Sequence, residues 1–419
     1  MSLNSAALVS VLALLAPLVI RLGRLPVPDA VLLIILGIIV GPQGIGWARV
    51  DEPVQVLSTI GLSFLLFVSG LEIRLDQLGG KIAQVALKSF ILSSVLALAV
   101  GGFLRSVHLV HSALLVAVIF SATALGVIVP VLKDSDAINE PVGKIVVAGA
   151  SLAEIFPVVL LSLLFSEKAR GLGSQVTLLT IFGALVAIVG LLIFSLEKWH
   201  TLRLAFQNLQ NTTAEIRVRA AVALLLGFAA LATSFGLEAI LGAFLAGVAI
   251  SLLDKDTENT HPLFRTKLQA VGFGALIPYF FVATGMSLNV RSFHSVTTIS
   301  RIPIFLAALI IARGIPAFLY SRVLSGKREV LAAALLQSTT LSIPVVGGTI
   351  GVHLGLIPSE NFVAMVAAAL VSVVVFPVTA SILMRNSAKN EGSQSQSESR
   401  INGSVRKAIS TRPQIVDDD

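Results

Sequence analysis

The sequence predicts an all-α polytopic membrane protein with about 13 transmembrane helices, inverted repeats and two broken helices. Three observations lead to this fold class. Of the 419 residues, 55% are hydrophobic and only 13% are charged, whereas a soluble domain carries about a quarter charged residues. The apolar residues fall in runs long enough to cross a bilayer. Glycine-rich motifs also recur along the chain at a spacing of about 205–215 residues.

The first apolar run sets the predicted orientation. No basic residue precedes it, and Arg21 and Arg24 follow it, which is the wrong polarity for a cleaved signal peptide. We therefore expect a retained helix with the N-terminus outside. The predicted spans lie at about 5–21, 27–43, 54–71, 82–103, 112–133, 142–165, 175–195, 216–235, 238–253, 268–288, 302–321, 329–354 and 361–384.

The distribution of basic residues supports this orientation. Cytoplasmic segments would hold roughly 18 Lys and Arg residues and external loops roughly 6. The sequence thus predicts a multi-pass protein of the cytoplasmic membrane with a cytoplasmic C-terminus. After residue 385 the chain becomes polar, and 386–419 is predicted to be a disordered cytoplasmic tail.

Composition also excludes several classes of function. The chain has no cysteine, which rules out disulfide scaffolds and thiol catalysis. Its six histidines are scattered without metal-ligand spacing, so no cofactor or resident metal is predicted. The net charge of +7 is assigned to basic cytoplasmic loops facing a lipid bilayer rather than to nucleic-acid binding. The sequence predicts no enzyme.

Glu154 is the most informative single residue. It lies near the centre of the 142–165 span, where an ionised carboxylate costs several kcal/mol unless it has a partner or water. We predict that it binds the transported ion and the proton. Pro157 removes a helical donor from the backbone carbonyl of Ala153, which becomes a candidate oxygen ligand. The alternative is a structural ion pair with Arg313, near the centre of the 302–321 span.

Two spans carry polar residues in their middles. One break lies in 112–133 and the other in 329–354, where Pro344 frees the carbonyl of Thr340. Paired, interrupted spans predict a midplane ion site; alternatively, Ser and Thr hydroxyls bond back to their own helices. The candidate residues of the breaks are Ser121, Ala122, Thr123, Gln337, Ser338, Thr339, Thr340 and Ser342.

The repeated motifs occupy equivalent places in two halves of the chain. The segment 35–41 matches 240–247, and 67–72 matches 282–287. The matched spans are seven apart, an odd number, so the two units cross the membrane in opposite directions. Glu72 closes the second motif at a predicted interface, where a solvated charge is the simpler interpretation.

Several of these stretches together resemble the monovalent cation–proton antiporter superfamily, specifically its second family, which includes bacterial sodium–proton exchangers and glutathione-gated potassium efflux systems. The resemblance covers about 5–385. The stretches that carry it are Pro26–Gly46, Phe64–Glu72, Ser121–Ala124, Gly242–Gly247 and Phe280–Met286.

The resemblance implies a homodimer of thirteen-helix protomers, in which two crossed, broken helices face an essential carboxylate and a mobile core moves as an elevator. The core would comprise about 82–165 and 302–384, and the dimerisation scaffold about 5–71 and 175–288. Glu154 matches the essential acid and Thr123 the hydroxyl of the first break. Arg313 falls where the family carries Lys or Arg. The nucleotide-binding regulatory domain of potassium efflux systems does not follow in this chain.

One departure from the family pattern bears on stoichiometry. The usual acid is Asp preceded by Asp, Asn or Gln, whereas here the pair is Ala153-Glu154. Since arginine stays protonated in proteins, Glu154 is the only midplane group expected to titrate. We therefore expect one-for-one, electroneutral exchange of Na⁺ or K⁺ for H⁺. The alternatives are a channel-like potassium pathway, an organic-anion symporter on the same fold, and a membrane scaffold without transport activity.

Overall fold

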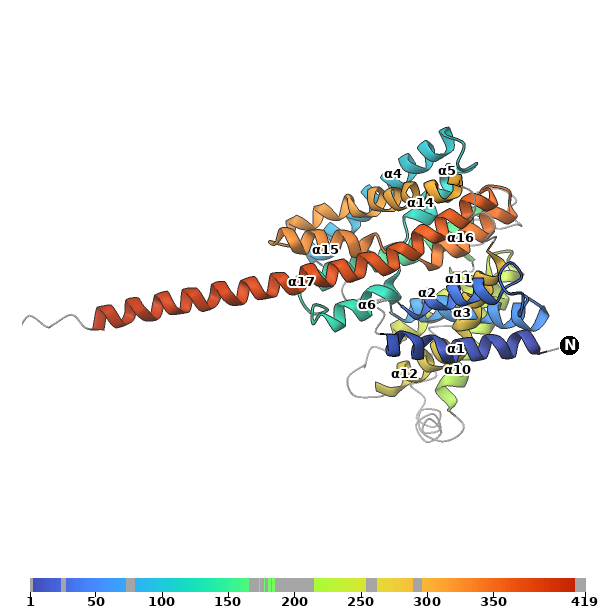
Figure 1. Cartoon of the computed structure of the whole chain (residues 1–419), viewed down its shortest axis with the longest axis horizontal. Helices are drawn as coiled ribbons and strands as arrows, with labels where there is room; N and C mark the ends of the chain where they lie inside the picture. The colour runs from blue at the N-terminus through green and yellow to red at the C-terminus, as the bar shows by residue number, and fades with distance from the viewer. Residues whose placement is uncertain are drawn as a thin grey trace, which may run out of the picture.

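Helices make up every regular element in the described part of the chain (Figure 1). The computed structural model describes residues 3–23, 28–72, 80–165, 215–253, 262–288 and 296–410, with a few single positions between 173 and 184, and only the backbone from residue 385 on. The elements are α1 (Asn4–Gly23), α2 (Asp29–Val40), α3 (Glu52–Glu72), α4 (Gly80–Ser106), α5 (Ala113–Phe120), α6 (Leu125–Asp134), α7 (Pro141–Phe165), α10 (Ile216–Ser234), α11 (Ala239–Leu253), α12 (Pro262–Val271), η2 (Gly272–Leu276), α13 (Ile277–Ser287), α14 (Val296–Leu309), η4 (Ile310–Gly314), η5 (Pro316–Arg322), α15 (Lys327–Gln337), α16 (Ser342–His353) and α17 (Ser359–Ser410).

The predicted membrane spans can be compared with these helices. Ten helical stretches among the described residues are long and apolar enough to cross a membrane, and α2 and α11 are shorter apolar helices. They correspond to twelve of the predicted spans. The remaining one, 175–195, falls largely outside the described residues. The prediction of a polytopic all-α membrane protein is confirmed, and the count of thirteen stays a prediction.

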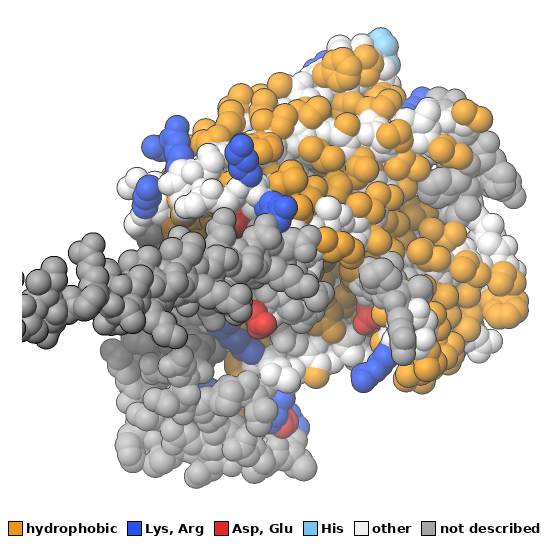
Figure 2. Space-filling model, turned by 60° about the vertical axis from the view of Figure 1, so that its left-hand side comes forward, with side chains coloured by type: hydrophobic (Ala, Val, Ile, Leu, Met, Phe, Trp, Pro, Cys, Tyr) orange, Lys and Arg blue, Asp and Glu red, His pale blue; other side chains and the backbone are white. Residues whose placement is uncertain are grey.

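The outer surface is suited to lipid. Figure 2 shows hydrophobic side chains over most of the coloured surface on this face, with several Lys and Arg side chains gathered at its left edge. On α4, Leu87, Ile91, Val95 and Leu98 are each between 44% and 58% exposed. Their spacing of three or four residues puts them on one side of the helix. An apolar stripe of this kind is stable only against hydrocarbon or another apolar surface.

The helices fall into two groups in space. Figure 1 shows α4, α5 and α14–α17 lying together, with α1–α3 and α10–α12 on the other side. Within the second group, α2 and α13 touch through glycine. A Cβ at Gly37 would collide with the carbonyl oxygen of Val282, and a Cβ at Gly285 would collide with that of Ile34. The absence of side chains at both positions lets the two backbones come into direct contact.

A second helix pair repeats this arrangement. A Cβ at Gly70 of α3 would collide with the carbonyl oxygen of Phe244 in α11, and one at Gly247 would collide with that of Phe67. Close packing of this kind gains dispersion contacts in a membrane, where apolar burial alone gives no driving force between helices. The glycines of the repeated sequence motifs therefore hold the second group together.

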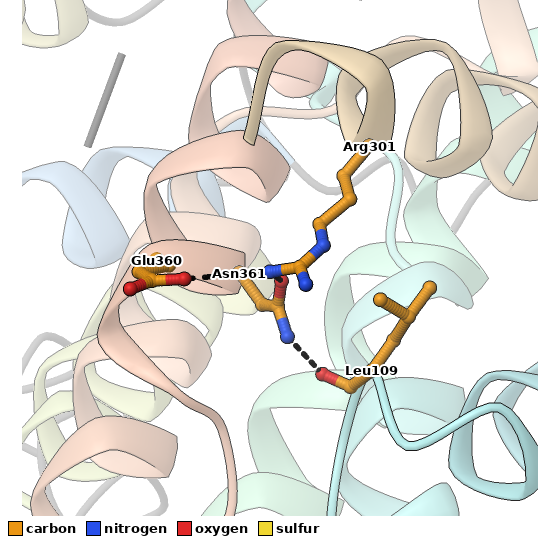
Figure 3. Close-up of polar contacts among 4 residues, drawn as sticks. All are labelled: Leu109, Arg301, Glu360 and Asn361. Atoms are coloured by element: carbon orange, nitrogen blue, oxygen red, sulfur yellow. Dashed lines mark hydrogen bonds and ion pairs between the residues drawn. The ribbon is translucent and has the colours of Figure 1, made fainter. Parts of the chain in front are cut away.

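In the first group, a polar cluster joins three elements at one end (Figure 3). Arg301 of α14 donates from Nη1 to Oδ1 of Asn361 at 2.6 Å and lies 3.6 Å from Glu360. Asn361 of α17 in turn donates from Nδ2 to the carbonyl of Leu109 at 2.5 Å. These contacts connect α14 and α17 with the loop between α4 and α5.

The last helix extends beyond the predicted span. α17 continues as a helix to Ser410, through a segment predicted to be disordered, and this part projects away from the other helices (Figure 1). A polar helix without tertiary packing has little to stabilise it. No described side-chain contact tests the order of 386–419, so the disordered tail stays a prediction.

Candidate ion-binding site

Two helices are interrupted, and the interruptions touch. α5 ends at Phe120 and α6 begins at Leu125, while α15 ends at Gln337 and α16 begins at Ser342. The backbone N–H of Ala124 in the first break donates to the carbonyl of Thr339 in the second at 2.8 Å. Non-helical backbone at this depth is tolerated only where such partners exist. The two predicted breaks are therefore present and in contact.

Three of the predicted hydroxyls in the breaks bond locally. Ser121, Ser338 and Thr339 each donate to a carbonyl three or four residues earlier in their own helices, at 2.8, 2.9 and 3.1 Å. This is the alternative that the sequence left open for these residues. Ala122 is buried, and Ser342 is half-buried at the first position of α16.

The backbone of Thr340 has a partner that the sequence did not indicate. The Thr340 N–H donates to the hydroxyl of Ser372 in α17 at 3.3 Å. The same hydroxyl lies 3.2 Å from the Thr340 carbonyl and 2.7 Å from that of Ala369. The Thr340 carbonyl lies before the N-cap of α16, outside the helix, and is within reach of a protein donor there. Ser372 was missed because a lone serine in an apolar span carries no distinctive pattern.

Arg313 lies in η4, a single turn of π-helix, and the proline that follows it explains part of its surroundings. Pro316 has no N–H to offer the carbonyl of Ala312. The hydroxyl of Ser93 in α4 donates to that carbonyl instead, at 2.7 Å. Single π turns inside longer helices are frequently found at functional sites.

The Arg313 guanidinium binds neutral oxygens at the crossing of the breaks. Nε donates to the Thr123 hydroxyl at 2.8 Å and lies 3.3 Å from the Gln337 carbonyl. Nη2 donates to the side-chain oxygen of Gln337, and Nη1 donates to Ser93 at 3.1 Å. The Phe90 ring lies 5.9 Å from Cζ. Arg313 and Thr123 are both buried, so these bonds replace the hydration that the charge has lost.

Glu154 lies in a different set of contacts. It is buried near the middle of α7, and its Oε2 accepts a hydrogen bond from the Leu125 N–H at 3.4 Å. The hydroxyl of Ser69 in α3 donates to the same carboxylate. No ion pair joins Glu154 to Arg313 in the described part of the chain. The predicted ion pair is therefore not formed in this structure.

The polarity of the broken helix ends explains why Glu154 and Arg313 do not pair with each other. Leu125 is the first residue of α6, and its N–H carries the partial positive charge of a helix N-terminus. Gln337 is the last residue of α15, and its carbonyl carries the partial negative charge of a C-terminus. Each buried charge thus faces the helix end of opposite polarity. Glu154 and Arg313 stabilise two different termini of the broken helices rather than each other.

Two further oxygens lie close to Glu154 in the sequence of α7. Ser151 precedes it by three residues on α7, and its buried hydroxyl has no hydrogen-bond partner in the described structure. Pro157, inside α7, leaves the Ala153 carbonyl without a helical donor. Carboxylate, hydroxyl and carbonyl oxygens are ligands for hard cations. The i, i+3 spacing could have identified Ser151, whereas nothing local in the sequence pointed to Ser69.

Solved structures with the same fold exist. One is the sodium proton antiporter MjNhaP1 from Methanocaldococcus jannaschii at pH 8, which matches with a TM-score of 0.62 and 16% identity, covering 91% of this chain and 97% of that one. An electron-microscopy structure of MjNhaP1 matches with a TM-score of 0.65 and 18% identity, covering 92% and 98%. At these identities the likeness establishes the fold.

The relatives found by sequence and the matching family model are all described as sodium/hydrogen antiporters or exchangers. YjbQ of Bacillus subtilis (strain 168), named as a candidate Na(+)/H(+) antiporter, is 31% identical over 395 residues, which are 90% of this chain and 62% of YjbQ. The chain thus spans less than two thirds of that relative. The probable Na(+)/H(+) antiporter 3 of Methanocaldococcus jannaschii is 29% identical over 371 residues, covering 85% of this chain and 90% of that protein. The family model described as sodium/hydrogen exchanger, transmembrane, matches residues 10–386, and the chain belongs to this sodium/hydrogen exchanger family.

Proposed function

We propose that the protein is a secondary-active antiporter that exchanges a monovalent cation, Na⁺ or K⁺, for H⁺. One observation carries the proposal: a buried carboxylate, Glu154, faces the first turn of a broken helix beside the crossing of the two breaks. Membership of the exchanger family and the antiporter names of the relatives support it, with Na⁺ favoured over K⁺.

Competition at Glu154 would couple the two ions. The carboxylate can be neutralised by one proton or by one cation, and crossing the membrane with the charge uncompensated is costly. Ser69 already donates to the carboxylate, the Ser151 hydroxyl is without a partner, and the Ala153 carbonyl lacks its helical donor. These oxygens can replace part of the hydration shell of a cation. Exchange follows because the two occupants exclude each other.

Arg313 argues for one-for-one exchange and against an anion symporter. Its nitrogens are engaged by Thr123, Gln337 and Ser93, so the guanidinium is not presented to a carrier substrate such as an organic anion. An arginine also keeps its proton through the cycle. With Ala153 beside the acid, Glu154 remains the one titrating group at this depth among the described residues. The exchange is electroneutral.

Alternating access by an elevator movement is the conformational part of the proposal. The glycine contacts of α2 with α13 and of α3 with α11 support a rigid scaffold. They also support inverted repeats, because each contact pairs a motif of one half with a motif of the other half. Glu154 lies on the core side, and Ser69 lies on α3 of the scaffold. Their hydrogen bond would break and reform as the core moves.

The remaining assignments extend the same proposal. The protein would act as a homodimer in the cytoplasmic membrane, with the N-terminus outside and the C-terminus in the cytoplasm. The bias of basic residues toward the cytoplasmic segments supports the orientation. The dimer rests on the family resemblance.

Proton flux in proteoliposomes tests the function. Vesicles containing the purified protein and a quenched pH dye receive Na⁺, K⁺ or Li⁺ in turn. Dequenching against the proton gradient is expected for Na⁺ with the wild type and not with Glu154→Gln, which keeps the size but removes the titratable group. The exposed Glu140 provides a matched control, since Glu140→Gln should behave as the wild type. Cation flux without proton movement would indicate a channel-like pathway, and normal exchange by Glu154→Gln would refute the central role of this residue.

A further inference from the structure

Two helical segments of the first group lie side by side and antiparallel. The hydroxyl of Ser93 in α4 donates to the carbonyl of Ala312 in η4, and the hydroxyls of Ser89 in α4 and Tyr320 in η5 are hydrogen-bonded to each other. As the residue numbers fall along α4, those of its partners rise. The start of α4 and the end of η5 are therefore at the same end of the pair.

Each member of the pair carries a stripe of exposed apolar side chains. The residues of the α4 stripe are Ile91, Val95 and Leu98, and those of the η4–η5 stripe are Ile311, Ile315 and Phe318, each between 41% and 58% exposed. Because the two segments are in contact, the stripes adjoin. An apolar surface of this kind on a membrane protein is covered by the acyl chains of lipid or by another apolar surface.

Both stripes end in basic residues at the same end of the pair. On α4, Lys88 and Lys81 precede Ile91 by three and ten residues, spacings that keep all three on one side of a helix, and both lysines are exposed. At the end of η5, Arg322 follows Phe318 by four residues and is also exposed. A basic edge thus borders the apolar surface.

The contact between the two segments brings Lys88 and Arg322 near each other. Lys88 directly precedes Ser89, Arg322 follows Tyr320 by two residues, and Ser89 is hydrogen-bonded to Tyr320. In the part of the chain that the structure describes, no carboxylate pairs with either basic residue. Neighbouring positive charges repel each other unless an anion lies between them. An anion from outside the described residues would neutralise both.

The depth of Lys88 along α4 indicates which anion. Lys88 lies eight residues after Gly80, the first residue of α4, or about 12 Å along the helix axis. The whole helix of 27 residues is about 40 Å long, close to the thickness of a bilayer with its headgroups. The backbone of Lys88 therefore lies below the headgroups, and its long side chain reaches back to the level of the lipid phosphates.

We propose that this surface of α4 and η5 binds an anionic phospholipid, whose phosphate lies between Lys88 and Arg322 and whose acyl chains lie along the two apolar stripes. A free phosphate ion would use the basic residues but leave the apolar stripes uncovered. The basic edge lies at the predicted cytoplasmic end of α4, and the cytoplasmic leaflet is the one that carries anionic lipid. The site is separate from Glu154 and does not depend on the proposed exchange activity.

Lipid titration followed by native mass spectrometry tests the site. The full chain in detergent is titrated with phosphatidylglycerol and, separately, with phosphatidylcholine, whose choline offsets the phosphate charge. The wild type should bind phosphatidylglycerol more tightly. Lys88→Gln combined with Arg322→Gln should raise the apparent Kd for phosphatidylglycerol about tenfold, equivalent to about 1.4 kcal/mol. The matched control combines Arg105→Gln, near the other end of α4, with Arg219→Gln on α10, both at exposed positions, and should bind as the wild type does.

A second variant tests the apolar contacts without altering charge. Phe318→Ala removes a ring that is 52% exposed on the η5 stripe, so the apparent Kd for phosphatidylglycerol should rise here too. Phe103→Ala is the control, because that ring is 61% exposed near the far end of α4 and away from the basic edge. Excess inorganic phosphate should not displace the lipid, since it cannot occupy the apolar stripes.

Four results would overturn the proposal. Equal affinity of the wild type for the two lipids would mean that lipid only coats this surface without a specific site. An unchanged Kd in the double charge variant would remove the role of Lys88 and Arg322, and an unchanged Kd in Phe318→Ala would remove that of the stripe. Displacement by inorganic phosphate would indicate an anion site that takes no lipid. If the double charge variant does not fold, Phe318→Ala and the comparison of the two lipids decide.

Discussion

The hydroxyl of Thr123 donates a 2.6 Å hydrogen bond to the backbone carbonyl of Gln337, 214 residues further along the chain. The same hydroxyl accepts a hydrogen bond from Nε of Arg313. One side chain thus joins the two helix breaks and the buried positive charge that compensates the end of α15. The stability of the crossing depends on this hydroxyl.

Thr123→Val should destabilise the protein with little change in shape. The substitution removes the hydroxyl that accepts from Nε of Arg313 and donates to the Gln337 carbonyl, which leaves those two groups only their longer 3.3 Å contact with each other, at a cost of about 1–3 kcal/mol. Thermal unfolding in detergent measures it. Thr349→Val is the matched control, because that exposed hydroxyl bonds only to the Val345 carbonyl of its own helix. Equal melting temperatures for the two variants would contradict the role of Thr123.

Removing Arg313 should destabilise the protein independently of Glu154. Arg313→Ala loses charge-assisted hydrogen bonds worth about 1.5–3 kcal/mol each, and Arg313→Lys should restore only part of the loss, because an ammonium cannot reproduce the guanidinium fork. Since no ion pair connects the two residues, the effects of Arg313→Ala and Glu154→Gln should add to within about 0.5 kcal/mol. Melting temperatures of the single and double variants measure the coupling. A departure from additivity, in which Glu154→Gln is more favourable in the Arg313→Ala background than in the wild type by more than about 0.5 kcal/mol, would show that the charges do pair.

Glu154→Asp should retain exchange with weaker cation binding. The shorter side chain withdraws the carboxylate from the Leu125 N–H, which is already 3.4 Å away, and from the neighbouring oxygens on α7. The titratable group itself remains. Dye-based transport at several Na⁺ concentrations should give a higher half-saturating concentration and a shifted pH profile. Complete loss of exchange would indicate that the carboxylate must touch Leu125 to function.

Transport by the wild type should move no net charge. Glu154 holds one proton or one monovalent cation, and Arg313 stays protonated throughout the cycle. Electrophysiology on a solid-supported membrane with active proteoliposomes should therefore record no steady charge translocation on addition of Na⁺. The same vesicles must show dye dequenching, which serves as the positive control. A steady current that disappears in Glu154→Gln would require a second carried proton.

Much of the fold followed from local composition. Whether a segment enters a bilayer depends on its own apolar length, so the spans and the midplane position of Glu154 could be predicted residue by residue. The breaks could be predicted for the same reason, because polar residues and proline weaken a helix where they stand. The repeated glycine motifs also singled out Gly37 and Gly285, although the sequence did not show which backbones these glycines contact.

The partners of the buried charges were decided by tertiary structure. Arg313 and Glu154 lie at similar depth in the sequence pattern, and depth alone predicted a pair. Their actual partners, Gln337 and Leu125, are backbone groups at helix ends whose polarity becomes available only when segments distant in sequence cross. Hydropathy is a property of single segments, whereas the compensation of a buried charge is a property of the surfaces brought against it.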